Sequence, residues 1–344
     1  MFSVLDKSLY VAEIDLWIDS LRPRSRCYVS HGHADHARPH EVVVTSPNNA
    51  RVCALRFGRR APQRDEPLIA SERGFGADER AEIFFETHAF NEPWRHAGHE
   101  LTLFSAGHVL GSSQLLIEGA RGRFVYTGDF KLERSYTAEP PEVKRCDTLL
   151  MECTYGRPQY AFPPRAEVAG AMVAWATRAL EDGVVPIFFA YSLGKAQEAM
   201  AILGNGGIAL TAHGAVASMA RVYEEAGVAL PPYRRYDAAA FDGRSALIWP
   251  PSGRALPTAV RGKAVRTAAL TGWVLGRGAN FNGRTDAGFP LSDHADYPSL
   301  LRYVELAQPK KVLLNHGGRE FVGRLRKLGI DAEYLEANAQ LALF

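Results

Sequence analysis

The segment from Ser30 to His36 has the sequence SHGHADH and places three histidines and one aspartate in one short loop after an apolar strand. Neutral imidazoles and a carboxylate crowded into a loop gain little packing and are costly to desolvate unless they bind something. On a turn that leaves a strand, alternate residues His31 and His33 are expected to point to one centre, and Asp35 and His36 to a neighbouring one. The pattern predicts two metal ions rather than one, and the alternative is a solvated histidine-rich loop.

Other potential ligands follow apolar runs elsewhere in the chain. His108 follows LTLFSAG, Asp129 follows FVYTG, and Glu152 closes TLLME. His294 lies in LSDHAD, and His316 follows KKVLLN. Taken singly, each of these residues is more often a hydrogen-bonded structural group than a ligand. Because α/β folds assemble their sites at the ends of successive strands, the set as a whole predicts one composite site.

Short strands dominate the first half of the sequence. They are bounded by Gly, Pro, Asp and Ser, and are expected over residues 26–29, 41–45, 101–104, 113–118, 123–127 and 148–152. After Pro163 the apolar residues take helical spacing, which predicts a helix over 165–182 that ends at Gly183. Beyond it the runs VVPIFFA, IALTA, ALIWP and RTAAL alternate with helical segments, as is typical of a mostly parallel α/β sheet. The sequence then predicts helices over 299–307 and 320–328, with a strand over 311–315 between them.

The composition is that of an ordinary globular protein. A chain of 344 residues fits two modest domains, or one domain with a large insertion. Hydrophobic residues at 47% and charged residues at 23% exclude disordered, collagen-like and disulfide-scaffold chains. The 4 cysteines form no CxxC pair, no apolar stretch reaches the ~18 residues of a membrane span, and no targeting segment is recognisable. These features predict a soluble cytoplasmic protein that does not contact membranes.

Ordered motifs along the chain resemble those of a known family. HGHADH, AGHVLGS, YTGDF, ECTYG, SDHAD and NHGG are similar to the motifs of the metallo-β-lactamase superfamily in its β-CASP nuclease branch. More narrowly, IDSLRP, GHVLGSSQ, VYTGDFKLE, YSLGKAQ and GFPLSDHAD resemble the bacterial ligase-associated DNA exonucleases, from about Ser8 to about Leu343. The stretch between Glu152 and His294 is short and no long extension follows, which disfavours the roles of the RNA-maturation members. Cys153 stands where Ser or Ala is more usual in the family.

This resemblance implies an α/β fold and a ligand set. A metallo-β-lactamase αββα sandwich is expected over 1–160 and 288–344, with a compact β-CASP-type α/β insert over 161–287. Asp129 would bridge two divalent ions, which would be held by His31, His33 and His108 and by Asp35, His36 and His316. The mixture of histidine and carboxylate suits Zn²⁺, with Mn²⁺ as the alternative.

Three further residues receive roles from the resemblance. Asp19 would orient a ligand by fixing the other ring nitrogen of a histidine, and its alternative is a simple turn residue. Glu152 and His294 would form an acid and histidine pair beside the leaving group, and Asp35 is also counted among the catalytic residues. A histidine held by a carboxylate can protonate a departing oxygen, while paired metal ions activate water and neutralise phosphoryl charge.

These parts predict a dinuclear-metal phosphodiesterase, specifically a DNA exonuclease in end processing or repair, with nucleic acid as its partner and a functional association with a DNA ligase. An RNA-processing nuclease of the same branch is the first alternative. A small-ester hydrolase on the same sandwich would not need the insert. A catalytically inactive nucleic-acid-binding scaffold belongs to a different class, and the intact ligand set disfavours it.

The insert is expected to handle the nucleic acid strand. Ser192, Gly194 and Lys195 lie between an apolar strand and a helix, where free N–H groups attract a substrate phosphate. A plain N-cap by Ser192 is the alternative.

Residues 271–284 of the insert include Trp273, Arg277, Phe281 and Arg284 and combine cations with stacking faces, as single-strand grooves do; a solvated loop is the alternative. His213 is a weak candidate for substrate contact. The other histidines are expected to be ordinary surface or loop residues, namely His40, His88, His96 and His99.

Overall fold

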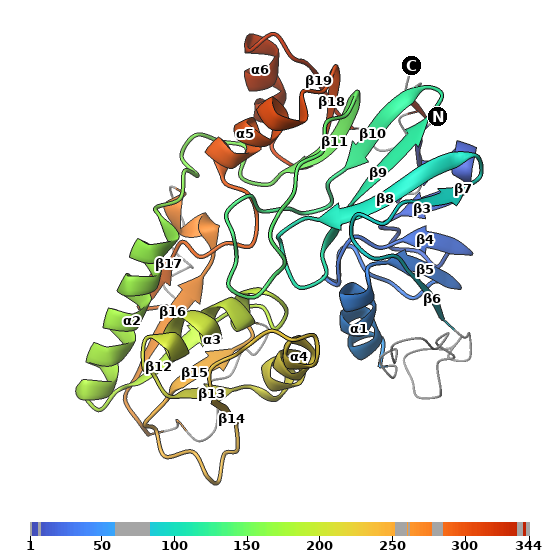
Figure 1. Cartoon of the computed structure of the whole chain (residues 1–344). Coiled ribbons are helices and arrows are strands. Elements are labelled where there is room, and N and C mark those ends of the chain that lie inside the picture. The colour runs from blue at the N-terminus through green and yellow to red at the C-terminus, as the bar shows by residue number, and fades with distance from the viewer. Residues whose placement is uncertain are drawn as a thin grey trace. The chain divides into compact units, whose positions relative to one another are not determined.

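The computed structural model describes residues 2–5, 8–58, 83–251, 260, 262–276, 285–335 and 340–341. The chain forms two compact units (Figure 1). Unit 1 contains Met1–Arg134, Ala138–Arg157 and Pro298–Phe344, and unit 2 contains Ser135–Thr137 and Pro158–Tyr297. Relative to the boundaries expected from the sequence, residues 135–137, 158–160 and 288–297 therefore fall in unit 2.

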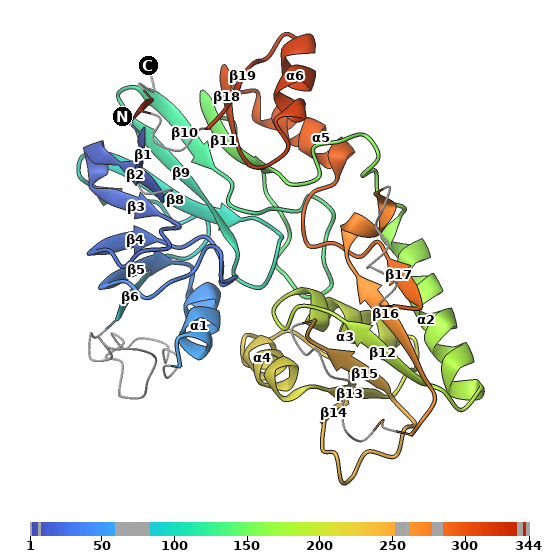
Figure 2. The ribbon, with the colours of Figure 1, turned by 180° about the vertical axis from the view of Figure 1, so that it is seen from behind.

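Unit 1 begins with a mixed sheet. In spatial order its strands are β20 (Gln340–Leu341), β1 (Phe2–Leu5), β2 (Ser8–Val11), β3 (Leu16–Ile18), β4 (Arg26–Tyr28), β5 (Val42–Thr45) and β6 (Phe84–Thr87). From β3 to β6 the neighbours pair in parallel, and from β20 to β3 they pair antiparallel. The pairing of β1 with β20 brings the two ends of the chain together (Figure 2).

The second sheet of unit 1 combines a meander with parallel strands. Its order is β19 (Asp331–Tyr334), β18 (Lys311–Gly317), β11 (Thr148–Cys153), β10 (Gly122–Tyr126), β9 (Ser113–Gly119), β8 (His99–Ser105) and β7 (Trp94–His96). Strands β7 to β10 pair antiparallel, whereas β10, β11, β18 and β19 pair in parallel.

The two sheets of unit 1 bury a shared core. Leu115 and Ile117 on β9 pack with Leu16 and Val44 of the first sheet. Gln114, the residue before Leu115 on β9, faces the other way and accepts a hydrogen bond from Tyr303 on helix α5 (Tyr297–Ala307). Because alternate strand residues face opposite sides, each sheet can cover the core on one face and a helix on the other.

Helices cover the outer faces of the two sheets. Helix α1 (Pro47–Arg56) packs Ala50 and Cys53 on the first sheet, and it begins where Ser46 Oγ accepts the N–H of Asn49. Helix α6 (Glu320–Lys327) lies beside β19 (Figure 1). The resulting order of layers, helix, sheet, sheet and helix, confirms the expected αββα sandwich.

Unit 2 contains a wholly parallel sheet. Its strands are, in spatial order, β14 (Tyr233–Arg235), β13 (Leu210–Ala212), β15 (Ala246–Trp249), β12 (Val185–Phe189), β16 (Val265–Leu270) and β17 (Ala287–Phe289). One face packs against three helices, which are α2 (Arg165–Glu181), α3 (Lys195–Asn205) and α4 (Gly214–Glu225). The opposite face buries Ile187, Leu247 and Trp249 with Val260. Short 3-10 helices span Ala12–Ile14 in unit 1 and Gly272–Leu275 in unit 2.

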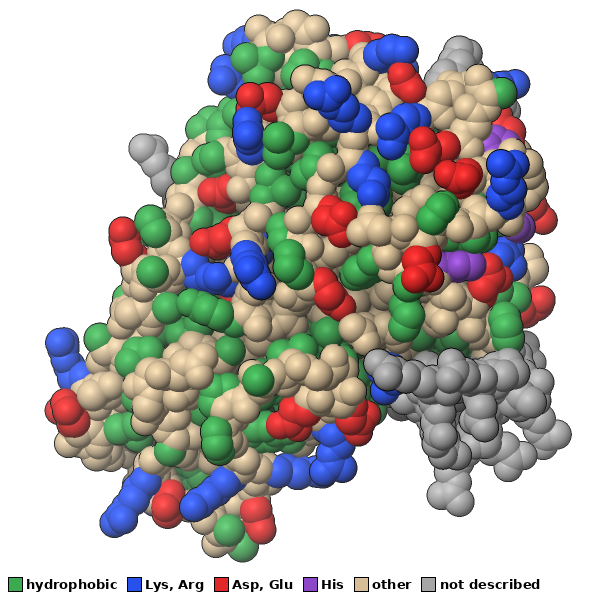
Figure 3. Space-filling model, viewed as in Figure 1, with side chains coloured by type: hydrophobic (Ala, Val, Ile, Leu, Met, Phe, Trp, Pro, Cys, Tyr) green, Lys and Arg blue, Asp and Glu red, His purple; other side chains and the backbone are tan. Residues whose placement is uncertain are grey.

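The strands and helices expected from the sequence are present, with ends shifted by one to a few residues. The sequence pattern missed β1–β3, α1, β6, β7, β14, β17 and β20. None of the described helices is long and apolar enough to cross a membrane. On the face drawn in Figure 3, basic and acidic side chains are interspersed, which agrees with the net charge of +2. Residues 277–284, which include Arg277, Phe281 and Arg284, lie outside the described residues.

Candidate metal centre

The histidine-rich segment after β4 forms a tight turn. The N–H groups of His36 and Ala37 both donate to the carbonyl oxygen of His33, at 3.0 and 2.8 Å. This turn brings the rings of His31 and His36 to within 4.2 Å of each other, centroid to centroid. Both of these side chains are buried, whereas Asp35 is exposed at the outer edge of the turn.

Asp129 reaches the same place from the end of β10. Gly128 has a φ of +54°, and a Cβ built on it would lie 2.8 Å from the Cβ of Ser30, so only glycine permits this close approach of the two loops. The carboxylate oxygen Oδ2 of Asp129 consequently lies 3.5 Å from Nε2 of His31 and 3.4 Å from Nε2 of His36. One carboxylate therefore faces two imidazoles of the turn.

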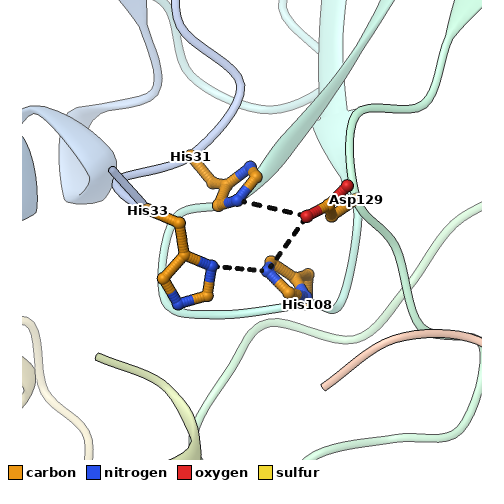
Figure 4. A group of neighbouring side chains, drawn as sticks. All are labelled: His31, His33, His108 and Asp129. Atoms are coloured by element: carbon orange, nitrogen blue, oxygen red, sulfur yellow. Dashed lines mark hydrogen bonds and ion pairs between the residues drawn. The ribbon is translucent and has the colours of Figure 1, made fainter. Parts of the chain in front are cut away.

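His108 arrives from the loop after β8 (Figure 4). Ser112 fixes that loop, because its Oγ accepts the N–H groups of His108 and Val109, each at 3.1 Å. Nε2 of His108 lies 3.0 Å from Nδ1 of His33 and 3.9 Å from Oδ2 of Asp129. One nitrogen or oxygen from each of His31, His33, His108 and Asp129 falls within 4.8 Å of all the others.

His316 lies beside this group at the end of β18. Its ring centroid is 5.0 Å from that of His36. The pairing of β11 with β18 shifts register at Cys153, and His316 takes a left-handed φ of +47° that a histidine rarely adopts. The next residue, Gly317, leaves no room for a side chain, because a Cβ there would lie 2.0 Å from the carbonyl oxygen of Cys153. Strained backbone of this kind is concentrated at functional sites.

The charges of the cluster favour a cation. Burial lowers the pKa of His36, but the carboxylates of Asp129, Asp19 and Asp35 outweigh it and raise the pKa to about 10. Burial raises the pKa of Asp35, but the positive charges of His36, His33 and His316 outweigh burial, and the pKa is lowered. Nε2 of His36 is buried and has no hydrogen-bond partner among the described residues. Imidazole nitrogen and carboxylate oxygen are zinc ligands, so the residues present fit a divalent ion of this kind.

Asp19, in the loop after β3, holds this cluster from behind. Its carboxylate accepts hydrogen bonds from His36 Nδ1 at 2.8 Å and from Tyr126 Oη at 2.8 Å. It also accepts the N–H and the hydroxyl of Ser30, at 2.7 and 2.6 Å. The sequence does not reveal the supporting roles of Ser30, Tyr126 and Ser112, because a serine or tyrosine at the end of a strand or in a loop is common and its hydrogen-bond partner depends on the fold.

Of the predicted acid and histidine pair, Glu152 belongs to unit 1 and His294 to unit 2. Glu152, on β11 in unit 1, is fully buried, and its Oε1 accepts the N–H of Phe130 at 2.9 Å. That bond supports the residue next to Asp129. His294 belongs to unit 2, where its N–H donates to Ser292 Oγ at 3.0 Å. Catalytic roles for these two residues remain predictions.

The expected phosphate site lies in the turn before α3. The N–H of Gly194 donates to Gln197 Oε1 at 2.9 Å, and those of Lys195 and Ala196 donate to carbonyl oxygens of the preceding turn. The Lys195 ammonium lies 3.6 Å from Oδ2 of Asp293, and both side chains are buried. The N–H groups of Gly194 and Lys195 thus have partners within the chain, and binding of a substrate phosphate by Ser192, Gly194 and Lys195 stays a prediction.

Two other histidines have structural contacts. His213 caps α4, because its Nδ1 accepts the N–H of Ala215 at 3.1 Å, and its ring packs edge-on against Trp249. His40, expected to be an ordinary surface or loop residue, lies in the loop before β5 but is only 3% exposed, and its Nδ1 accepts the N–H of Arg24 at 3.2 Å. Trp273 is 46% exposed and packs edge-on against Tyr160.

The sequence is similar to several known proteins. Residues 288–340 match the family model described as a Zn-dependent metallo-hydrolase RNA specificity domain. A probable DNA ligase of Opitutus terrae is 38% identical over 337 residues, covering 97% of this chain and 31% of the relative. The endoribonuclease ysh1 of Aspergillus fumigatus is 28% identical over 51% of this chain and 22% of the relative. Subunit 3 of the cleavage and polyadenylation specificity factor of Dictyostelium discoideum is 35% identical over 35% of this chain and 16% of the relative.

The chain thus spans about a third or less of the length of these relatives. The matches nevertheless agree with the architecture. The family model describes a metallo-hydrolase, and the chain has an αββα sandwich together with a parallel α/β insert. These matches support the resemblance of the chain's ordered motifs to the β-CASP branch of the metallo-β-lactamase superfamily.

Proposed function

We propose that the protein is a dinuclear-metal phosphodiesterase that degrades DNA from a strand end. The observation that carries this proposal is the position of Asp129, whose Oδ2 lies within 3.5 Å of Nε2 of both His31 and His36. One carboxylate oxygen is thereby within reach of two sets of imidazole donors. This geometry suits a carboxylate shared by two ions, with His33 and His108 completing one set and Asp35 and His316 the other.

In this proposal the metal ions and the protein side chains have separate roles in catalysis. Two divalent ions, Zn²⁺ or Mn²⁺, would supply Lewis-acid activation of water and offset the charge on the phosphoryl oxygens. Asp19 holds Nδ1 of His36, which leaves Nε2 directed at Asp129. Glu152 keeps the loop at Phe130 in place. His294 donates a proton to the departing oxygen, as a general acid does.

The preference for DNA rests on the similarity to the probable DNA ligase of Opitutus terrae, which extends over 97% of this chain. No other relative compared above covers as much of it. We propose on this basis that the protein works in DNA end processing together with a ligase. The free, buried thiols of all 4 cysteines fit a reducing cytoplasm.

RNA is the second candidate substrate. The family model that matches residues 288–340 is described as an RNA specificity domain, and ysh1 is named an endoribonuclease. Because the same ions and ligands hydrolyse either phosphodiester, the metal centre cannot separate the two substrates.

Digestion of matched single-stranded DNA and RNA, labelled at either end, tests the proposal with Zn²⁺ or Mn²⁺ supplied. Release of label from one end of DNA, lost in Asp129→Ala, is the expected result. Preferential degradation of RNA would replace the DNA assignment with the second candidate. Binding of both strands without cleavage, under either ion, would identify a nucleic-acid-binding scaffold instead of an enzyme.

A further inference from the structure

The Lys195–Asp293 pair joins two segments of unit 2 that are far apart in sequence. Lys195 is the first residue of α3, and Asp293 lies in the loop between β17 and α5. Nζ of Lys195 and Oδ2 of Asp293 are 3.6 Å apart, and the two side chains are 6% and 7% exposed. Burying two opposite charges costs much of what their attraction returns, so a pair of this kind is weak evidence for stability.

The lysine is held on a rigid support. Ala196, Ala199 and Met200 of α3 are buried in the core of unit 2. Gln197 fixes the turn before the helix, because its Oε1 accepts the N–H of Gly194 and its Nε2 donates to the carbonyl oxygen of Ser192. The Lys195 ammonium therefore starts from a backbone that has little freedom to move.

The aspartate belongs to a short turn that carries His294. The N–H of His294 donates to Ser292 Oγ at 3.0 Å, and Ser292 Oγ donates to the His294 carbonyl oxygen at 3.4 Å. Both bonds lie within the turn and fix its shape. Further along, Asp296 accepts the N–H of Phe162 at 3.1 Å. The Lys195–Asp293 contact fastens the turn itself to α3.

We infer that Lys195 is a positioning residue, which acts through Asp293 to set the place of His294, and that it is not a phosphate contact. The inference rests on the proposed function, in which His294 protonates the leaving oxygen. A proton donor must be held within hydrogen-bond reach of the atom that it protonates, so a loosened turn lowers the rate of leaving-group departure. Substrate binding need not change.

Lys195→Met removes the charge and keeps the length of the side chain. We expect it to reduce kcat on an ordinary DNA phosphodiester by about 10- to 100-fold, to leave KM unchanged, and to affect an activated nitrophenyl phosphodiester much less. Lys195→Arg should recover most of the lost rate. Lys195→Met/Asp293→Leu, which buries no charge, should regain the stability of the wild type but not its rate on DNA.

Hydrogen exchange of residues 291–297 supplies a readout that does not depend on activity. It should quicken in Lys195→Met and in Asp293→Asn. In Leu210→Ala, the matched control that weakens the core of unit 2 away from this turn, the segment should not exchange faster than the rest of the unit.

Three results would overturn the inference: unchanged exchange in Lys195→Met, an equal loss of rate on the two substrates, or a raised KM with unchanged kcat. If the wild type cleaves no phosphodiester, the proposed function fails while the exchange experiment still decides whether Lys195 holds the turn.

Discussion

Nδ1 of His36 donates a hydrogen bond to the carboxylate of Asp19 at 2.8 Å, and this contact fixes which ring nitrogen of the imidazole can bind a metal ion. The opposite ring nitrogen, Nε2, is thereby directed at Asp129, 3.4 Å away. Asp19 itself adopts a left-handed φ of +45°, a costly conformation for a residue other than glycine. Its carboxylate compensates with hydrogen bonds from Ser30 and Tyr126.

Asp19→Asn should weaken metal binding by about 10- to 100-fold, because a neutral amide orients His36 less strongly and lowers its basicity. Titration of the metal-free protein with Zn²⁺ measures the effect. Asp15→Asn is the matched control, since Asp15 has the same φ of +45° but is exposed and contacts Tyr10 instead. Equal affinity in the wild type and Asp19→Asn would show that Asp19 is a turn residue only.

Asp129→Ala should lose activity and at least one of two bound metal ions. The reason is that its Oδ2 lies near both His31 and His36, so that truncation removes an anionic ligand from both donor sets. Metal content per chain, measured by elemental analysis after gel filtration, gives the answer. A fully active wild type with a single tightly held ion would contradict the dinuclear assignment.

His294→Ala should retain both metal ions and reduce turnover by roughly 10²- to 10⁴-fold, the range for a lost general acid. A substrate with an activated leaving group needs no proton and should lose far less. Parallel kinetics on the two substrates, with metal analysis of the same preparation, separate the roles. Loss of metal in this variant would make His294 a ligand instead.

The stability of the protein should fall on acidification through the range in which His40 titrates. Burial lowers the pKa of His40 from 6.5 to about 4, with Asp19 opposing the shift and Arg24 adding to it. Between these values the unfolded chain binds the proton more readily than the folded chain, so the free energy of unfolding rises with pH from about 4 to 6.5. The full contribution is about 3 kcal/mol.

Comparison with His40→Asn isolates this effect, because asparagine keeps an acceptor for the Arg24 N–H but does not titrate. The free energy of unfolding, measured between pH 4 and pH 7.5, should fall less steeply in the variant. Identical slopes for the two proteins would mean that His40 titrates normally in the folded state.

The local pattern of the sequence was sufficient to identify the parts of the candidate centre. SHGHADH follows β4, and His108, Asp129 and His316 lie in loops or at strand ends that follow apolar runs in the sequence. Strand and helix periodicity is a local property, as is the chemistry of a ligand. The same periodicity predicted α2, β12 and the parallel sheet of unit 2.

Elements with weaker local patterns were missed. Helix α1 begins with Ser46 as its cap and Pro47 at its first position, but its apolar face is small. Strands β7 and β14 have 3 residues each, too few to show alternation. Their structure depends on pairing with β8 and β13, which the sequence does not reveal locally.

Only the tertiary structure decided which residues meet. His316 joins His36 because β11 and β18 pair in parallel across more than 150 intervening residues, with a register shift that turns the histidine. Gly194 and Lys195 have the sequence of an anion site. In the structure, however, Gln197 accepts the N–H of Gly194, and Asp293 pairs with the ammonium of Lys195. A sequence motif states which donors and acceptors are present. Their partners depend on strand register, backbone conformation and burial, which arise from the packing of the whole chain.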